Sequence, residues 1–128
     1  MKIEHIGIWV KDLEKMREFY QTYLHMHCGK KYENPRKGFS SYFLSFENGA
    51  RIELMTKKDL SETTGQTSDA DGLAHIAFSV GSKESVNAMT GRLRADGFEI
   101  VGEPRTTGDG YYESVIADPE GNLVELTE

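Results

Sequence analysis

The sequence predicts an α+β fold in which two paired βαβββ modules form a curved mixed β-sheet cleft. Two repeats predict it. The segment His-Ile-Gly-Ile-Trp-Val (residues 5–10) recurs 70 residues later as His-Ile-Ala-Phe-Ser-Val (75–80). Arg-Ile-Glu-Leu-Met-Thr (51–56) recurs 72 residues later as Leu-Val-Glu-Leu-Thr-Glu (123–128). A repeat of this length indicates two copies of one supersecondary unit that share a core.

The first module has the order β-α-β-β-β. Apolar and polar residues alternate over 2–10, which predicts a strand. Asp12 occupies the N-cap position of a helix, and apolar residues follow it at spacings of three and four. Turn residues at Asn34-Pro35 and Glu47-Asn48-Gly49 separate the later strands. Those strands are expected near residues 27–33, 39–47 and 50–56.

The second module repeats this order. Ser82 is the expected cap of its helix, and Gly97 follows that helix. Between the modules, residues 57–72 are almost wholly polar and predict a linker or surface loop. We therefore expect one domain over residues 1–128. Its strands in the second module are expected at 73–80, 98–102, 111–117 and 122–127.

Composition restricts the function classes. The chain has 128 residues and a net charge of −6, and no Lys/Arg run is longer than a pair, which argues against nucleic acid as a partner. Cys28 is the single cysteine, so an intrachain disulfide is impossible, as in a reducing cytoplasm. No apolar segment approaches the roughly 18 residues of a membrane helix. We expect a cytoplasmic protein that acts on a small molecule and contacts no membrane.

Four repeated polar residues are candidate metal ligands: His5, Glu53, His75 and Glu125. The sequence neighbours of each are apolar, so alternation places all four on the sheet faces opposite the helices. Each alone could be a solvated side chain. Together, two imidazoles and two carboxylates suit one divalent ion, namely Ni²⁺, Co²⁺, Fe²⁺, Mn²⁺ or Zn²⁺. Four protein ligands in a six-coordinate shell leave two positions for water or substrate, as in a catalytic site.

A second potential metal site is His25-Met26-His27-Cys28. It offers only one sulfur, and a helix that ends nearby separates its side chains, so a metal is disfavoured there. We expect His25 at the helix C-terminus, where His tolerates the left-handed conformation better than most residues.

Taken together, the motifs resemble the vicinal oxygen chelate superfamily, which includes glyoxalase I, methylmalonyl-CoA epimerase, extradiol dioxygenases and the fosfomycin and bleomycin resistance proteins. The resemblance covers essentially the whole chain. It is carried by His-Ile-x-Ile near the N-terminus, Ile-Glu-Leu, His-Ile-Ala-Phe-Ser-Val and Asp-Pro-Glu-Gly-Asn-Leu-Val-Glu-Leu. The four-ligand set is most similar to that of bacterial glyoxalase I. The resemblance to the epimerases is weaker, because Ala74 precedes His75 where they often have paired histidines.

The resemblance implies an activity and a base. It implies a divalent-metal-dependent lyase or isomerase of the glyoxalase I type, with a thiol hemiacetal of methylglyoxal as one possible substrate. Glu125 matches the carboxylate that moves the proton in that family. A homodimer is also expected, since modules this small do not cover both faces of their own sheet.

Departures from the family bear on the substrate. Glyoxalase I commonly has an arginine, used for glutathione, where this chain has Trp9. Trp9 either fills the cleft or stacks on an apolar or planar substrate, and we favour stacking. Arg36, Lys37 and Arg105 are loop cations, each either an ordinary surface charge or a group that holds an anionic substrate, and Arg105 is the one we assign to the substrate. Two other functions stay open: a metal-free binding or antibiotic-sequestering protein, and an Fe²⁺ ring-cleaving dioxygenase, against which the fourth ligand Glu53 argues.

Overall fold

A computed structural model describes residues 1–61 and 72–128. The chain divides into two compact units, residues 1–62 and 63–128. Most of the predicted linker 57–72 lies outside the described residues. In the part that is described, no helix is long and apolar enough to cross a membrane.

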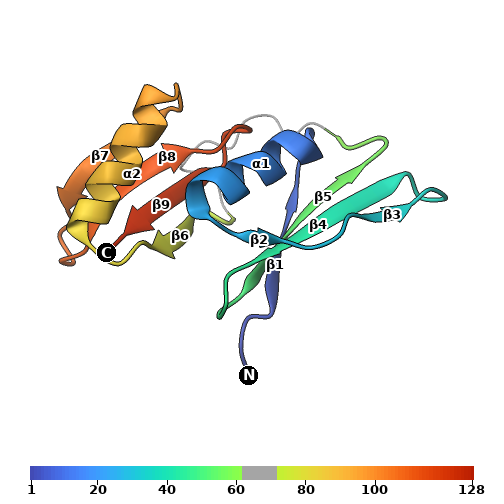
Figure 1. The fold of residues 1–128 in the computed structure, drawn as a ribbon, viewed down its shortest axis with the longest axis horizontal. Helices are drawn as coiled ribbons and strands as arrows, with labels where there is room; N and C mark the ends of the chain where they lie inside the picture. The colour runs from blue at the N-terminus through green and yellow to red at the C-terminus, as the bar shows by residue number, and fades with distance from the viewer. Residues whose placement is uncertain (62–71) are drawn as a thin grey trace. The chain divides into compact units, whose positions relative to one another are not determined.

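The first unit is a mixed sheet with one helix (Figure 1). β1 pairs in parallel with β5, and β4 pairs antiparallel with β5, β2 and β3. The sheet order is therefore β1-β5-β4-β2, with β3 also on β4. The elements are β1 (His5–Trp9), α1 (Leu13–Leu24), β2 (His27–Cys28), β3 (Tyr32–Asn34), β4 (Phe39–Ser45) and β5 (Arg51–Lys57).

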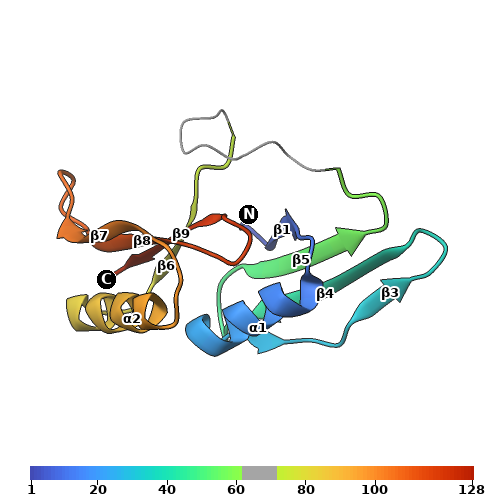
Figure 2. The same ribbon diagram turned by 90° about the horizontal axis from the view of Figure 1, so that it is seen from above.

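Helix α1 begins and ends where the sequence predicts. The Asp12 side chain accepts a hydrogen bond from the Lys15 backbone N–H at 3.0 Å, and His25 has φ 54° in the left-handed region. The helix packs on one face of the first sheet (Figure 2). The buried apolar side chains of this unit are Val10, Leu13, Met16, Phe19, Tyr20, Leu24, Met26, Tyr42, Leu44, Ile52 and Leu54.

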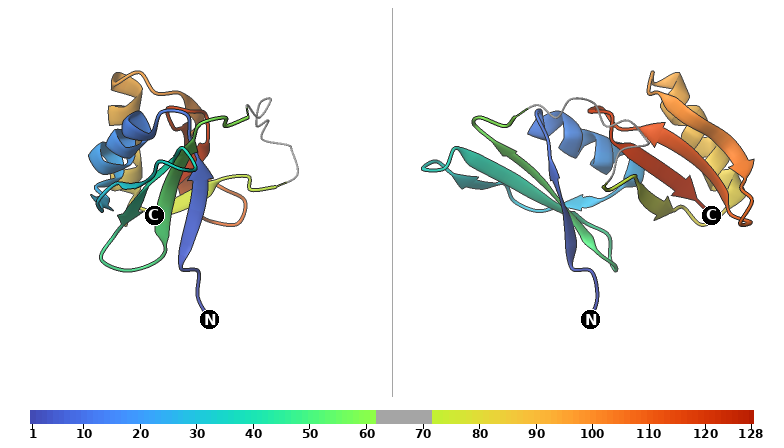
Figure 3. Two further views of the ribbon diagram at one scale, coloured as in Figure 1. Left: turned by 90° about the vertical axis from the view of Figure 1, so that its right-hand side faces the viewer. Right: turned by 180° about the vertical axis from the view of Figure 1, so that it is seen from behind.

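The second unit repeats this arrangement (Figure 3). β6 pairs in parallel with β9, and the sheet order is β6-β9-β8-β7. Ser82 caps α2 by accepting a hydrogen bond from the Ser85 backbone N–H at 3.1 Å. Val86, Leu93, Ile116, Val124 and Leu126 form its apolar core. The elements are β6 (Ile76–Ser79), α2 (Lys83–Ala95), β7 (Ile100–Thr106), β8 (Tyr112–Ala117) and β9 (Leu123–Thr127).

The predicted α+β class and order of elements are confirmed, and the strand ends differ. The segment predicted as one strand at 27–33 is two short strands, because β2 and β3 pair with different parts of β4. β7 extends to Thr106 instead of ending near 102, since register shifts after Ile100 and Gly102 let its pairing with β8 continue.

Candidate metal and substrate site

His5 and Glu53 form a pair on the first sheet. In the parallel register of β1 and β5, Gly7 lies opposite Glu53, and His5 lies two residues earlier on the same face. The His5 Nε2 and Glu53 Oε2 atoms are 3.8 Å apart. The Glu53 side chain is 16% exposed. Its neighbours Ile52 and Leu54 are buried on the opposite face, as alternation predicts.

His75 and Glu125 form the corresponding pair on the second sheet. Ala77 lies opposite Glu125 in the register of β6 and β9. The His75 Nε2 and Glu125 Oε2 atoms are 3.5 Å apart, and the Glu125 side chain is 15% exposed. Gly7 and Ala77 occupy the same position in the two units, so a small residue faces each glutamate. The repeat in the sequence is therefore a repeat of geometry.

Glu4, which is paired with Arg51, contacts the other ring nitrogen of His5. Its Nδ1 atom is hydrogen-bonded to the Glu4 carboxylate, which also accepts a hydrogen bond from Arg51. The hydrogen bond from His5, followed by that from Arg51, lowers the pKa of Glu4. Because Glu4 holds Nδ1, Nε2 is the nitrogen left for a metal ion. The second unit has Ala74 at the corresponding position, so this contact is not repeated.

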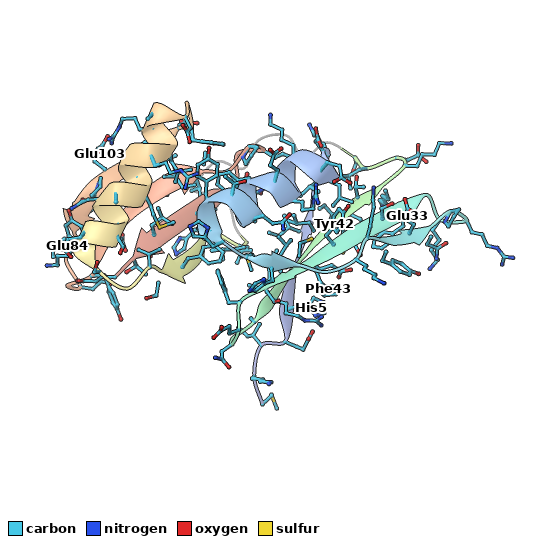
Figure 4. All side chains as sticks on the ribbon, viewed as in Figure 1. His5, Glu33, Tyr42, Phe43, Glu84 and Glu103 are labelled. Carbon is cyan, nitrogen blue, oxygen red and sulfur yellow. The ribbon has the colours of Figure 1, made fainter. Side chains whose placement is uncertain are left out.

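Phe43 and Arg51 complete the surroundings of His5. The Phe43 ring meets the imidazole edge-on with centroids 5.3 Å apart, and the Arg51 guanidinium lies over Phe43 at 4.2 Å. Figure 4 labels His5 and Phe43 next to one another, whereas Tyr42, the adjacent residue of β4, points toward α1. The first histidine is therefore held on two sides.

Glu113 and Arg105 lie on the Glu125 face of the second sheet. Glu113 is paired with Thr127, two residues beyond Glu125, and Arg105 is paired with Glu113. Burial raises the pKa of Glu113, and the charge of Glu125 and a hydrogen bond with it act in the same direction. Arg105 partly offsets this pKa increase. The predicted substrate cation thus lies beside a carboxyl group that contacts the predicted base.

Trp9 lies on the His5 face of the first sheet, as predicted. It is 47% exposed, and its ring contacts Phe39 at a centroid distance of 6.1 Å. The alternative cations Arg36 and Lys37 are exposed in the turn between β3 and β4. Of Trp9, Arg36 and Lys37, Trp9 is the side chain that lies on the same sheet face as a predicted metal ligand.

The four predicted ligands come together as two pairs, one in each unit. Among residues 1–61 and 72–128, no three His, Cys, Asp or Glu side chains are grouped as a metal site, and this includes the 25–28 segment. The donor set of the pairs nevertheless fits a divalent ion. Each pair has an imidazole nitrogen facing a mostly buried carboxylate oxygen, and such groups bind borderline metals.

Sequence reasoning missed Glu4 and Glu113. Comparison of the two repeats could have found Glu4, because a carboxylate precedes the first histidine and Ala74 precedes the second. The position of Glu113 could have been predicted from the Asp118–Asn122 turn. Counting back from that turn in a hairpin places Glu113 opposite Thr127.

Comparison with known proteins extends these findings. The sequence profile of the Glyoxalase/Bleomycin resistance protein/Dioxygenase superfamily matches residues 2–126. The lactoylglutathione lyase of Haemophilus influenzae is 31% identical over 131 residues, which cover 100% of this chain and 93% of that protein. The ethylmalonyl-CoA/methylmalonyl-CoA epimerase of Cereibacter sphaeroides is 28% identical, covering 99% and 97% of the two chains.

A solved structure shares the fold. The trypanothione-dependent glyoxalase I of Leishmania major superimposes with a TM-score of 0.80 at 24% identity, covering 100% of this chain and 86% of that one.

Proposed function

Because the chain belongs to the glyoxalase/bleomycin resistance protein/dioxygenase superfamily, we propose that it is a divalent-metal-dependent lyase or isomerase of the glyoxalase I type. The reaction is proton transfer next to a carbonyl of a small oxygenated substrate, such as a thiol hemiacetal of methylglyoxal. The observation that carries the proposal is the duplicated pair of a histidine and a mostly buried glutamate. Relatives named lactoylglutathione lyase support it.

His5, Glu53, His75 and Glu125 are the proposed ligands of one divalent ion, which is Ni²⁺, Co²⁺, Zn²⁺, Mn²⁺ or Fe²⁺. When bound, such an ion supplies positive charge that stabilises negative charge on substrate oxygens. We also propose a cytoplasmic homodimer. Its size is testable by sedimentation at micromolar concentration, and a strict monomer would refute the dimer.

Glu125 is the proposed general base. Its carboxylate takes the proton from the carbon beside the carbonyl and returns it to the neighbouring carbon, so the reaction is an isomerisation without net oxidation. Its low exposure limits access of water that would exchange this proton. Glu113 lies near it on the same face of the second sheet. Glu53 and the two histidines transfer no proton in this scheme.

The thiol is not assigned to glutathione. Trp9 offers an indole in place of a guanidinium, and an indole forms no salt bridge with a carboxylate. Relatives and neighbours are themselves named for different substrates: lactoylglutathione, trypanothione and acyl-CoA. We propose Trp9 and Arg105 as substrate-binding residues.

The test is an assay of the metal-loaded protein with methylglyoxal and a series of thiols. Glu125→Gln keeps the size of the side chain and an oxygen but removes the basic carboxylate. We expect a loss of roughly 100-fold or more in rate, since a positioned base contributes about that much. The control is Glu103→Gln, an exposed carboxylate paired with Arg94 outside the site, which should retain the parent rate.

Three outcomes would overturn the proposal. Parent-like activity of Glu125→Gln would reduce Glu125 to a ligand. Oxygen consumption with catechols by the Fe²⁺-loaded protein would identify a ring-cleaving dioxygenase. Ligand binding that a chelator does not affect, without turnover of any hemiacetal, would identify a metal-free sequestering protein.

A further inference from the structure

Three aromatic rings form a corner on the first sheet. The Trp9 and Phe39 rings are nearly perpendicular at 89°, with centroids 6.1 Å apart. Tyr32 meets Phe39 at 60° and 6.0 Å. The rings come from β1, β4 and β3, so the pairing of three strands fixes the corner. Trp9 and Tyr32 are 47% and 54% exposed, so part of each side chain is accessible to a ligand.

Lys57 supplies a positive charge to this corner. It is paired with Phe39 across β4 and β5, and its Nζ atom lies 5.1 Å from the centre of the Trp9 ring. Within residues 1–61 and 72–128, no carboxylate forms an ion pair with Lys57. Among these described residues its ammonium group therefore contacts an aromatic ring and no carboxylate, which leaves it available to an added anion.

The corner continues the surface that carries His5 and Glu53. Trp9 is paired with Met55, two residues beyond Glu53, and Met55 is paired with Ser41, which is opposite Tyr32. All of these residues therefore share one face. Trp9 lies four positions after His5 along the strand, a span of about 13 Å.

Gly7 lies between His5 and Trp9 and places no side chain on this face of the sheet. A Cβ atom at Gly7 would lie 2.8 Å from the Met55 methyl group, closer than real contacts allow. A ligand whose oxygens lie near His5 and Glu53 can thus run over Gly7 and Met55 to reach the rings.

We propose that this corner, Trp9, Tyr32, Phe39 and Lys57, binds a flat aromatic group that carries a carboxylate. A flat ring can stack on one wall while it meets the other edge-on, and both arrangements are favourable. The carboxylate pairs with the Lys57 ammonium. An aliphatic acid gains the ion pair without the stacking, and an aromatic amine is repelled by Lys57. The role of this corner in the enzyme rests on the proposed function. There, the aromatic acid is the part of the substrate that does not react.

Trp9 is the only tryptophan of the chain, so its fluorescence reports ligand at the corner. The probe is trans-cinnamate, titrated into the metal-free protein with excitation at the red edge of the indole band. Two comparison ligands separate the contributions: 3-cyclohexylpropionate has the charge without the ring, and cinnamylamine has the ring with the opposite charge. We expect cinnamate to change the fluorescence saturably and to bind about tenfold more tightly than either.

Variants test the residues, with calorimetry as the common readout. Lys57→Met should weaken cinnamate binding about tenfold and leave cinnamylamine unweakened. Trp9→Leu should also weaken cinnamate binding about tenfold, and Trp9→Phe should recover most of this affinity, because a ring is restored. Lys15→Met and Tyr111→Ala, an exposed cation on α1 and an exposed aromatic outside the corner, should match the parent.

Equal affinity for the three ligands, or cinnamate binding that Lys57→Met and Trp9→Leu leave unchanged, would overturn the inference. Dissociation of an oligomer by Trp9→Leu without any effect of ligand would also overturn it, and would make the corner an interface between copies. Since the titration uses metal-free protein, it separates this inference from the proposed reaction. If the protein binds cinnamate selectively but the metal-loaded protein turns over no substrate, only the proposed reaction is refuted. If the metal-loaded protein turns over substrate but the protein binds the three ligands equally, only the proposed binding at the corner is refuted.

Discussion

His5 and His75 occupy the same position in two repeats, yet their second ring nitrogens meet different surroundings. Glu4 holds the Nδ1 atom of His5 and is itself held by Arg51, whereas Ala74 offers the second histidine no such group. A carboxylate on the far ring nitrogen fixes the tautomer of a ligating histidine and raises its basicity. The two histidines are therefore unequal donors.

Glu4→Gln should accordingly weaken metal binding. We expect the Kd for Co²⁺ or Ni²⁺ to rise about tenfold, the lower end of what such outer contacts contribute, because Glu4 is exposed. In the metal-free variant, ¹⁵N chemical shifts of His5 should show both tautomers where the parent shows mainly one. Glu47→Gln, an exposed carboxylate in the β4–β5 turn, is the control. Unchanged affinity and tautomer would show that Glu4 has no influence on the site.

For single residues, the sequence predicts the sheet face on which a side chain lies better than it predicts the side chains that it contacts. Period-two alternation is local, so it correctly placed Glu53 and Glu125 opposite their buried neighbours. The Glu113–Glu125 contact depends on the β8–β9 register, and the Glu4 contact depends on two side-chain rotamers beside a strand end. Neither register nor rotamer follows from alternation.

At the scale of elements, a charged group fastens α1 to its sheet. The Tyr42 hydroxyl donates to Glu14 at 3.1 Å, and Lys31 and Arg17 contact the same carboxylate at 3.1 and 3.2 Å. The hydrogen bond from Lys31, followed by that from Tyr42, lowers the pKa of Glu14. The group ties the first helical turn to β4 and to the segment between β2 and β3.

This group predicts a pH-dependent contribution to stability. A lowered pKa in the folded state means that the stabilisation is present above the unfolded pKa of about 4.3 and is lost as the pH falls through the folded value. Glu14→Gln should therefore reduce the free energy of unfolding by about 0.5 kcal/mol at pH 7, a small value because Glu14 is half exposed.

Urea unfolding at pH 7 and at pH 3 measures this difference. The two proteins should converge at the lower pH, and high salt should narrow the gap at pH 7. Glu18→Gln, exposed on the same helix, is the matched control. A gap between parent and Glu14→Gln that persists at pH 3 would show that shape, not charge, is responsible.

The helices illustrate which elements a sequence predicts well. Asp12, Ser82 and His25 take the cap positions predicted for them, because capping depends on a few adjacent residues. Strand ends were predicted less well. The segment 27–33 is split because β2 and β3 pair with different parts of β4, and β7 is longer because it keeps pairing with β8. A local sequence pattern does not contain this pairing.

At the scale of the whole molecule, the duplicated frame carries the functional proposal. The repeat of 70 residues predicted two modules, and each module contains a His–Glu pair within 4 Å. Each pair alone offers two donors, which is fewer than the three or four protein ligands of ordinary catalytic metal sites. We therefore propose that both pairs bind the same ion.

An equilibrium titration of the metal-free protein with Co²⁺ or Ni²⁺ tests this claim, with the parent compared against two double variants. One lacks the first pair (His5→Ala with Glu53→Ala) and the other lacks the second (His75→Ala with Glu125→Ala). We predict one tightly bound ion per parent chain and a loss of at least about 100-fold in affinity in each double variant, because either pair is half of the proposed ligand set. Two ions per parent chain, no ion at all, or a double variant that keeps one ion at parent affinity would contradict it.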